Sequence, residues 1–578
     1  MGEFLAIRRR IGPIRFSCNV ALVLFWITVL GTHSARAEDQ AISDTGLLIA
    51  GSSSSGDGFG SALALSDQRA VISAPFCDDR GVDAGAVYAY ERQQGAWVAI
   101  QHLLPPGRLT DGLFGTALGI EGDQLVVGAP GATHGGAVFV YRHENGVWVL
   151  TQEIHAMNAN PGDRFGAALA LRAGNLFVGA PRGDRLGQAG GAVFALKYTA
   201  GNWKFTDVLQ GSDTAPGDLF GSSLAFDGET LVVGAIGHSE TAPWEGGAYL
   251  FEAQDGKWEE RLELPAGALG ASAFFGSSVA VDGDLVAVGA QGESTTQMLS
   301  GAVFVFERTS SGWQRSARLK AAKARVGAQF GGALVLEGGT LIVGARWDPT
   351  AFANAGAVFL YQLAEDPNGG AWQEREMLIS RQPEYNQWFG TALALEYGEL
   401  LIGAPRADTP TIDAGMVSVW SLQPGERFCA GDGSGAMCPC GNLGRAERGC
   451  RNSVSEGVLL HAEGSNRLMR DDLSFSVFDL PPGRAALLVV GRNSLANGAG
   501  ALHGDGLLCV GGQLSWLGVR TSDAEGAASW WGTGITASGA WQEGDTAYFQ
   551  VWYRDGVTVS PCNTGFNTSN AYQVTFEQ

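Results

Sequence analysis

The chain has 578 residues, a length that allows two to four domains. Its 85 glycines are about twice the usual share, and apolar residues make up 45% of the sequence, so a disordered or collagen-like chain is excluded. The net charge is −21, and no run of basic residues occurs after residue 37, which argues against a nucleic acid as partner.

Residues 1–37 have the order of a secretory signal. A basic stretch from Arg8 to Arg15 precedes an apolar run, and Ala35-Arg36-Ala37 offers small residues for cleavage. The apolar run is short for a membrane span, although an uncleaved anchor is the alternative. We therefore expect a secreted, periplasmic or cell-surface protein with no membrane insertion after the signal is cleaved.

Between residues 38 and 425 a Phe-Gly dipeptide recurs seven times. A pair of small residues follows each Phe by fourteen positions, and a second small pair, such as Gly247-Ala248 in the fourth unit, opens the next apolar run. Each unit has the pattern of four short strands bounded by Gly and Asp. Seven such units predict an all-β protein with a seven-bladed β-propeller, with a stacked solenoid as the alternative. The phenylalanines are Phe59, Phe114, Phe165, Phe220, Phe275, Phe330 and Phe389.

A tryptophan in the fourth strand indicates how the ring closes. Six Trp residues each lie 17 positions before the next Phe, and no such Trp strand follows the last unit. The matching position before the first Phe is Ile42. We therefore expect the N-terminal strand, within residues 41–49, to supply the outer strand of the last blade, because a closed ring leaves no exposed edge. The tryptophans are Trp97, Trp148, Trp203, Trp258, Trp313 and Trp372.

At these positions, over about residues 40–425, the chain resembles the FG-GAP repeat family, whose propellers occur in integrin α subunits and secreted bacterial proteins. The motif is clear where Phe114-Gly115 is followed by Val127-Gly128-Ala129-Pro130, and where Phe389-Gly390 is followed by Ile402-Gly403-Ala404-Pro405. The resemblance implies a propeller used for adhesion or ligand recognition on the face of the 2–3 and 4–1 loops.

The family's calcium sites do not carry over to this chain. Calcium-binding members have an Asp-rich loop between the first two strands, whereas this sequence leaves only a tight turn, such as Arg172-Ala173-Gly174-Asn175. Calcium takes six to eight oxygen ligands, more than such a turn supplies. We expect no metal site and no cofactor.

Residues 426–578 form a second region, in which the repeat stops and cysteines appear. Their even number in an exported module predicts three disulfides with 15 possible pairings; a zinc site at Cys438, Cys440 and Cys450 is the alternative. Strand-like runs predict a β-sandwich-like domain. Its tryptophans either pack in the core or form a sugar-stacking platform: Trp516, Trp530, Trp531, Trp541 and Trp552. The six cysteines are Cys429, Cys438, Cys440, Cys450, Cys509 and Cys562, and Cys77 lies alone in a propeller loop.

No pattern in the sequence indicates an active site. The eight histidines are scattered and lack the context of a metal site or a catalytic triad, and no nucleophile turn or phosphate-binding loop is present. We therefore expect a monomeric, non-enzymatic protein that recognises an extracellular protein or glycan. A secreted hydrolase-like enzyme that uses the propeller channel or the C-terminal module is the alternative.

The 2–3 loops are the candidate binding surface, because they vary in sequence on a repeated scaffold and contain Trp and Arg, the residues enriched in binding hot spots. The alternative is that these residues only pair with one another as solvated ions. The candidates are Asp78, Asp79, Arg80, Arg182, Asp184, Trp244, Arg346, Trp347, Asp348, Arg406 and Asp408.

Overall fold

The structure is a computed structural model that describes residues 43–576 with short gaps. The predicted signal (1–37), Ile42, Asp184 and Trp531 lie outside the described residues. The described part is all-β: it contains no α-helix, and its helical segments are two single 3-10 turns, η1 (Pro439–Gly441) and η2 (Ala496–Gly498). The gaps are 52–53, 67–68, 94–95, 158, 184–189, 266, 268, 365–370, 397, 410, 423–425, 434–435, 446–447, 464–472, 525, 531–540, 543, 557–560 and 563.

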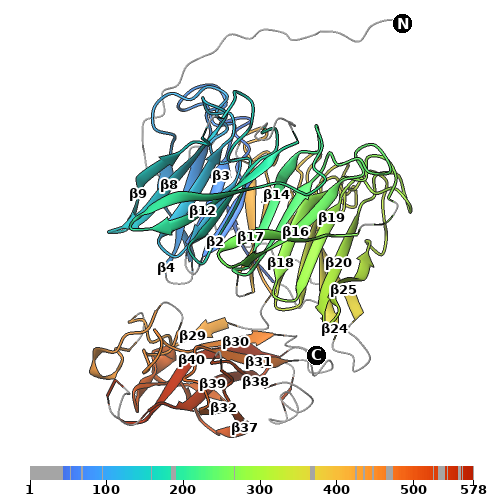
Figure 1. Cartoon of the computed structure of the whole chain (residues 1–578). Helices are drawn as coiled ribbons and strands as arrows, with labels where there is room; N and C mark the ends of the chain where they lie inside the picture. Colours follow the sequence, from blue (N-terminus) through green and yellow to red (C-terminus); the bar gives the residue numbers. More distant parts are fainter. Residues whose placement is uncertain are drawn as a thin grey trace, which may run out of the picture. The chain divides into compact units, whose positions relative to one another are not determined.

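Repeated four-stranded antiparallel sheets make up the described residues before the C-terminal region (Figure 1); we number them sheet 1 to sheet 7 in chain order. The first strands are β2 (Leu63–Ser66), β6 (Leu118–Glu121), β10 (Ala168–Arg172), β14 (Phe220–Phe226), β18 (Phe275–Asp282), β22 (Ala333–Glu337) and β26 (Leu393–Glu396). The second strands are β3 (Arg69–Ala74), β7 (Gln124–Ala129), β11 (Asn175–Ala180), β15 (Thr230–Ala235), β19 (Leu285–Ala290), β23 (Thr340–Ala345) and β27 (Glu399–Ala404). The third strands are β4 (Ala86–Gln93), β8 (Ala137–Glu144), β12 (Ala192–Thr199), β16 (Gly247–Gln254), β20 (Ala302–Thr309), β24 (Ala357–Ala364) and β28 (Met416–Ser421). The fourth strands are β5 (Ala96–Leu103), β9 (Val147–Ile154), β13 (Asn202–Leu209), β17 (Lys257–Glu263), β21 (Gly312–Leu319), β25 (Ala371–Leu378) and, in sheet 7, β1 (Ser43–Leu48).

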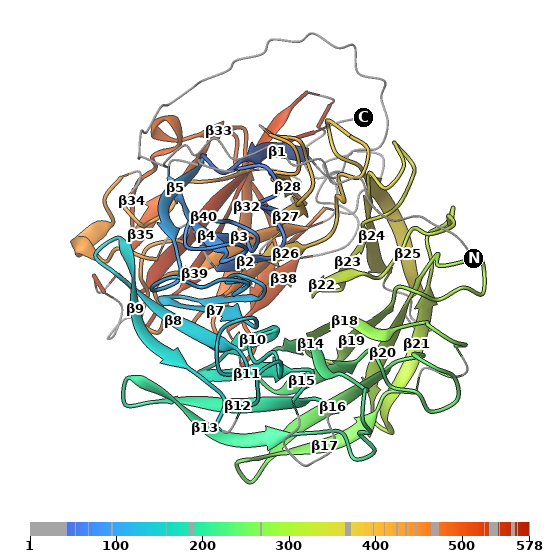
Figure 2. The same cartoon turned by 90° about the horizontal axis from the view of Figure 1, so that it is seen from above.

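The sheets are arranged radially, in a β-propeller-like fold (Figure 2). The first strands lie toward the centre and the fourth strands lie at the rim. Each first strand contacts the first strand of the next sheet, and β26 contacts β2. Each apolar core is shared between two adjacent sheets; in one of them Phe59 and Tyr88 of sheet 1 pack with Val417 and Val419 of sheet 7. Every sheet therefore depends on its neighbours for burial of its faces.

The pairing of a glycine with the Phe of the next sheet explains both halves of the repeat motif. A parallel bridge joins Gly85 to Phe114, and equivalent bridges recur around the repeats. A Cβ on Gly85 would lie 2.1 Å from the carbonyl oxygen of Phe114, and the φ of Gly85 is +88°, so only glycine fits this position. In sheet 4 the bridge falls on Gly246 rather than on the predicted Gly247, so all the 2–3 loops except that of sheet 2 have equal length.

The N-terminal strand β1 pairs antiparallel with β28, the last strand of the repeats, as the position of the tryptophans predicts. Leu48 and Ala50 are buried in the core that sheets 1 and 7 share. A parallel bridge between Phe59 and Gly415 joins the same two sheets. The first and last segments of the repeat region are therefore side by side.

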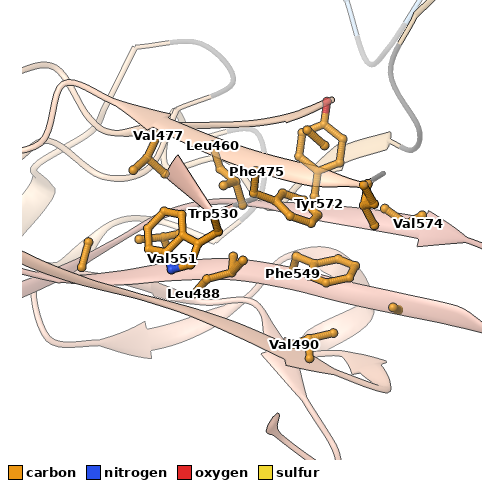
Figure 3. Close-up of a cluster of buried hydrophobic side chains, with 14 of the residues drawn as sticks. Leu460, Phe475, Val477, Leu488, Val490, Trp530, Phe549, Val551, Tyr572 and Val574 are labelled. Atoms are coloured by element: carbon orange, nitrogen blue, oxygen red, sulfur yellow. The ribbon is translucent and has the colours of Figure 1, made fainter. Parts of the chain in front are cut away.

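The described C-terminal region contains two larger sheets and two short two-stranded sheets. The two sheets share one apolar core, in which Phe475 and Trp530 face Leu488 and Phe549 (Figure 3). The five-stranded sheet has the order β29 (Glu426–Phe428), β40 (Phe566–Thr575), β39 (Thr546–Arg554), β32 (Ala485–Gly491) and β37 (Ser515–Thr521). The three-stranded sheet has the order β30 (Leu459–Glu463), β31 (Ser474–Phe478) and β38 (Ala528–Trp530). The two-stranded sheets are β33 (Asn493–Ser494) with β36 (Val510–Gly511), and β34 (Ala501–His503) with β35 (Gly506–Leu508).

Three disulfides join the six C-terminal cysteines, as the sequence predicts, so the zinc alternative is wrong. The pairs are Cys429–Cys509, Cys438–Cys450 and Cys440–Cys562, and Cys77 is a buried free thiol. Disulfides are typical of oxidising, extracellular environments. None of the helices in the described part is long and apolar enough to cross a membrane.

The four C-terminal tryptophans that the structure describes do not gather on one face as a platform. Trp530 and Trp541 belong to the core, and Trp552 is half-buried with its ring centroid 5.1 Å from that of His503. Trp516 is 71% exposed. Among the described tryptophans, the prediction that they pack in the core is therefore confirmed for Trp530 and Trp541 but not for Trp516.

Candidate functional site

The loops between second and third strands, and those that lead from a fourth strand to the next Phe, lie at one edge of the sheets. The Gly–Phe bridges join the two kinds of loop, because each glycine ends a 2–3 loop and each Phe ends a 4–1 loop. This loop edge carries the predicted binding residues. The opposite edge has short turns of two or three residues between first and second strands.

At the loop edge of sheets 6 and 7, two tryptophans and two arginines form a cluster. The Arg406 guanidinium lies 4.0 Å from the ring centroid of Trp388. The Arg346 guanidinium lies 5.3 Å from the ring of Trp347 and 6.0 Å from that of Trp388, and its Nε donates a hydrogen bond to Gln329. The two rings are 6.3 Å apart. We call Arg346, Trp347, Trp388 and Arg406 the Arg–Trp cluster.

The four candidate arginines lack carboxylate partners. Among the described residues, no carboxylate oxygen lies within 4 Å of the guanidinium nitrogens of Arg80, Arg182, Arg346 or Arg406. Burial lowers the pKa of Arg346, which nevertheless stays protonated because an arginine titrates far above neutral pH. These four arginines therefore do not pair with loop carboxylates, as the alternative interpretation of the loops expects. Their Nη donors are available to a ligand.

Three candidate aspartates hold the loops in shape. The carboxylate of Asp78 accepts the backbone N–H of Asp83 at 2.9 Å, and Asp408 accepts that of Asp413 at the same distance. The buried Asp348 accepts the backbone N–H of Thr350 at 2.8 Å. These side chains already have local hydrogen-bond partners, so their geometry supports a structural role.

The other candidate binding residues lie in the 2–3 loops of sheets 1, 3 and 4, outside the Arg–Trp cluster. Asp79, Arg80 and Arg182 are exposed, and Asp184 falls in a gap. Trp244 is also exposed, and its ring centroid lies 6.3 Å from that of Phe274. Only the residues of sheets 6 and 7 are brought together, with Trp388 added from a 4–1 loop.

A second cluster, which the sequence analysis missed, surrounds His238 in sheet 4. His238 Nδ1 lies 3.2 Å from Asp218 Oδ2, and the Tyr249 hydroxyl donates to Asp213 at 2.8 Å. Although burial opposes it, the hydrogen bond with Asp218 and the surrounding carboxylates raise the pKa of His238. Burial and the charge of Asp213 raise the pKa of Glu263. Both shifts reflect an excess of negative charge in a partly desolvated place.

The corresponding part of sheet 1 holds a third group of titratable residues. Burial raises the pKa of Asp57 to about 6 and that of the Cys77 thiol to about 12, with the charge of Asp79 adding to both. His102 stacks on Tyr88 with ring centroids 4.4 Å apart, and burial lowers its pKa. The histidines are therefore not as isolated as their scatter in the sequence suggests.

Comparison with known proteins identifies the repeat. The FG-GAP repeat family matches five segments, 42–90, 148–196, 203–251, 258–306 and 313–361. The last four of these start at the Trp of a fourth strand and end in the third strand of the next sheet. No curated protein shows a match.

Two solved structures that align with this chain are those of putative 6-phosphogluconolactonases. The one from Bacteroides uniformis has 12% identity and a TM-score of 0.39, covering 56% of this chain and 85% of its own. The one from Bacteroides fragilis has 13% identity and a TM-score of 0.38, covering 59% of this chain and 88% of its own.

Proposed function

This chain carries FG-GAP repeats, and from that premise we propose that it is an exported, non-enzymatic recognition protein. Its ligand is an acidic site on an extracellular protein or glycan, and the Arg–Trp cluster is the contact surface. The observation that supports the proposal is the stacking of two arginines that lack carboxylate partners on two neighbouring tryptophans.

The chemistry of the cluster suits an anionic group. A guanidinium presents several donors in one plane and binds carboxylate, sulfate or phosphate through two parallel hydrogen bonds. Stacking on Trp388 holds the Arg406 side chain in place, so that less conformational entropy is lost on binding. The fixed positive charge also attracts an acidic ligand to this part of a chain whose net charge is negative.

We propose further that the sheets form one closed seven-bladed ring, residues 38–425, with residues 426–578 as a separate β-sandwich-like domain. The contact of β26 with β2 and the pairing of β1 with β28 support closure. In a closed ring both faces of every sheet are covered by neighbouring sheets, so the ring holds the loops rigidly for recognition. The three disulfides support export, since they form in oxidising compartments.

The enzyme alternative draws support from the cluster around His238, because perturbed pKa values gather at catalytic sites. Binding remains our proposal, since the Arg–Trp cluster offers donors for recognition but no nucleophile. The His238 cluster is taken up below.

A binding screen followed by variants tests the proposal. The secreted chain is screened against arrays of glycans and extracellular proteins, and each ligand found is titrated. Arg406→Ala and Trp347→Ala should weaken binding by at least about 30-fold, since hot-spot truncations cost about 2 kcal/mol or more. Arg346→Lys keeps the charge but removes the planar fork, so it should weaken binding less than Arg406→Ala.

Matched controls separate recognition from folding and from general charge. Arg142→Ala removes an exposed arginine at the far end of β8, and Asp282→Ala changes a turn at the edge opposite the loops. Neither should change the affinity. Equal losses in the controls and the cluster variants, or an unchanged affinity in Arg406→Ala, would refute the placement of the site.

A further inference from the structure

One backbone position recurs in every 2–3 loop, and its side chain varies from apolar to charged among the sheets. At this position, which we call the loop-turn position, the N–H bonds to the carbonyl that ends the second strand, and the carbonyl accepts the N–H of the bridging glycine. The residue is buried in all seven sheets. In order, the residues are Cys77, Ala132, Gly183, His238, Glu293, Asp348 and Ala407.

A second recurring position lies near the end of the fourth strand. It is the residue paired with the aromatic side chain of the third strand, as Glu263 is paired with Tyr249 in sheet 4. In sheet 2 this position holds Glu153, and in sheet 5 it holds Arg318. The fold thus brings the loop-turn residue close to a fourth-strand residue. The charge and hydrogen-bonding groups of the two side chains differ from sheet to sheet.

Sheet 5 shows how a buried acid at the loop-turn position is neutralised. Glu293 is fully buried and forms ion pairs of 2.7 Å with both Arg318 and Lys320. Although burial opposes it, the hydrogen bonds from Lys320 and Thr295 and the charge of Lys320 lower the pKa of Glu293. Buried charges require such partners, since an unpaired one is costly.

Sheet 4 has the opposite balance at the equivalent positions. His238 is only 6% exposed, and the carboxylates of Asp213, Asp218 and Glu263 surround it. Among the described residues, no Lys or Arg pairs with any of these three carboxylates. Apart from His238 itself, the described residues place no cationic side chain against these carboxylates, so a bound cation would balance their charge.

The imidazole of His238 has one satisfied and one unsatisfied nitrogen. Nδ1 lies 3.2 Å from Asp218 Oδ2, whereas the buried Nε2 makes no hydrogen bond. The nearest acidic atoms to Nε2 are Asp213 Oδ2 at 3.7 Å and Glu263 Oε1 at 3.8 Å. In the tautomer that carries its proton on Nδ1, His238 donates a hydrogen bond to Asp218. The lone pair of Nε2 is then directed at the space between Asp213 and Glu263.

We propose that Asp213, His238 and Glu263 bind a divalent transition metal ion of the Zn²⁺ class. Zinc bonds of about 2.0–2.2 Å to nitrogen and oxygen place tetrahedral ligand atoms about 3.3 Å apart. The observed separations from Nε2 need to shrink by only about half an ångström, and the three ligand atoms all lie within 4.8 Å of one another. This inference goes beyond the recognition proposed above and does not rest on it.

The surroundings of the three ligands suit a metal site. Asp218 orients His238 from behind, and the Tyr249 hydroxyl holds the second carboxylate oxygen of Asp213, which are the outer contacts that position metal ligands. An imidazole ligand favours zinc over calcium or magnesium, which prefer oxygen alone. Asp213 and Glu263 are partly exposed, so water is available as a fourth ligand.

Metal titration of the full chain tests the proposal. All measurements use a Cys77→Ala background, because Cys77, Asp79 and His102 form a second group of metal-ligating side chains that would compete for zinc. Alanine is chosen because it occupies the same position in sheets 2 and 7. After chelation and dialysis, Zn²⁺ is added in a calorimetric titration, and Co²⁺ is added as a spectroscopic probe. We expect one zinc per chain and a visible Co²⁺ band typical of tetrahedral coordination.

Variants assign the ligands. His238→Ala and Glu263→Gln should each weaken zinc binding by more than about 100-fold. Glu263 is partly exposed, so its variant folds even if His238→Ala does not. The matched control is Glu153→Gln, which removes the same charge from the equivalent position of sheet 2, where the loop-turn residue is Ala132; it should leave the affinity unchanged. No zinc binding by the parent, or equal affinity in Glu263→Gln and Glu153→Gln, would overturn the assignment.

Discussion

The repeat region and the C-terminal region bury their apolar side chains in different ways. In the repeats, each core lies between two adjacent sheets, as where Val71 of sheet 1 packs with Phe114 and Leu125 of sheet 2. In the C-terminal region, one core lies between a five-stranded and a three-stranded sheet. A second buried cluster there contains Cys429, Cys438, Cys450 and Cys509. The repeats thus gain stability from neighbours, whereas the C-terminal region adds covalent links.

This difference determines where each region is vulnerable. A sheet without a neighbour exposes one apolar face and one strand edge, so the repeat region is sensitive at the junction of its first and last sheets. A small domain with a limited core is sensitive to loss of its disulfides instead. The same separation explains why binding chemistry varies among the repeats, since side chains in the loops can change while the backbone bridges and the shared cores between sheets are kept.

The largest expected effect comes from removing β1. Deletion of residues 41–49 exposes the edge of β28 and removes Leu48 from the core shared by sheets 1 and 7, so the melting temperature of the repeat region should fall sharply. Differential scanning calorimetry measures the shift. An unchanged melt would contradict closure by β1.

If the deletion variant does not fold, point variants in β1 test the same prediction. Leu48→Ala should lower the free energy of unfolding by about 2–3 kcal/mol, because Leu48 is 9% exposed and packs in a shared core. Leu47→Ala, one residue earlier and 46% exposed, is the matched control and should cost less than about 0.5 kcal/mol. Equal losses in the two variants would contradict the observed register.

Reduction of the disulfides should have the next largest effect, confined to the C-terminal region. Each bridge contributes about 2–4 kcal/mol by restricting the unfolded chain, and two of the three close loops of 80 and 122 residues. Hydrogen exchange with and without reductant measures protection of each region separately. Peptides from β39 and β40 should lose protection, while those from β15 and β16 should not; an equal loss in both would contradict the comparison.

A smaller effect is expected from His461 in β30. Burial and the positive charge of Arg427 lower the pKa of His461 to about 3, so the folded state keeps it neutral while the unfolded state takes up a proton below about 6.5. The unfolded state then binds more protons between pH 6.5 and 3, and stability falls as the pH falls, by up to about 1.4 kcal/mol per unit. His461→Leu should flatten this slope in urea titrations, whereas the exposed His134→Leu should not. A slope that is equally steep in both variants would contradict this assignment.

The fold was largely predictable because its signals are local and repeated. The distance along the chain from Phe59 to the next Phe-Gly gives the length of one repeat. The position of Trp97, before Phe114, indicates that a fourth strand precedes each Phe-Gly of the next repeat. The chemistry at the loop edge was less predictable. Trp388 joins the Arg–Trp cluster from a 4–1 loop that varies as much as the 2–3 loops, so no pattern singles it out.

The His238 cluster shows what one sequence conceals and where a signal exists. Asp213, His238 and Glu263 come from a 4–1 loop, a 2–3 loop and the end of β17, so no short motif contains them. Their contact becomes visible only after the repeats are aligned, when His238 and Glu263 fall on positions that hold an ion pair, Glu293 with Arg318, in the next sheet. The one-residue error at Gly247 obscured that alignment.

The smallest expected effect is that of calcium, which should not stabilise the repeats. The turns between first and second strands have two or three residues, and their acids are already engaged. Asp227 Oδ1 accepts the N–H groups of Glu229 and Thr230, and its Oδ2 accepts that of Gly283 in the next sheet. Asp282 likewise accepts the N–H of Gly338. Because calcium needs six to eight oxygens, these turns provide no cage for it.

Calcium added to the chelator-treated chain should therefore shift the melting temperature by less than about 1 °C, since a ligand stabilises only the state that binds it. Zinc added to the same sample is the internal comparison and should raise the melting temperature if the site at His238 is correct. A rise of several degrees with calcium, retained in Glu263→Gln, would mean that oxygen ligands converge elsewhere in the repeats and that the tight turns are not the reason for the missing calcium loops.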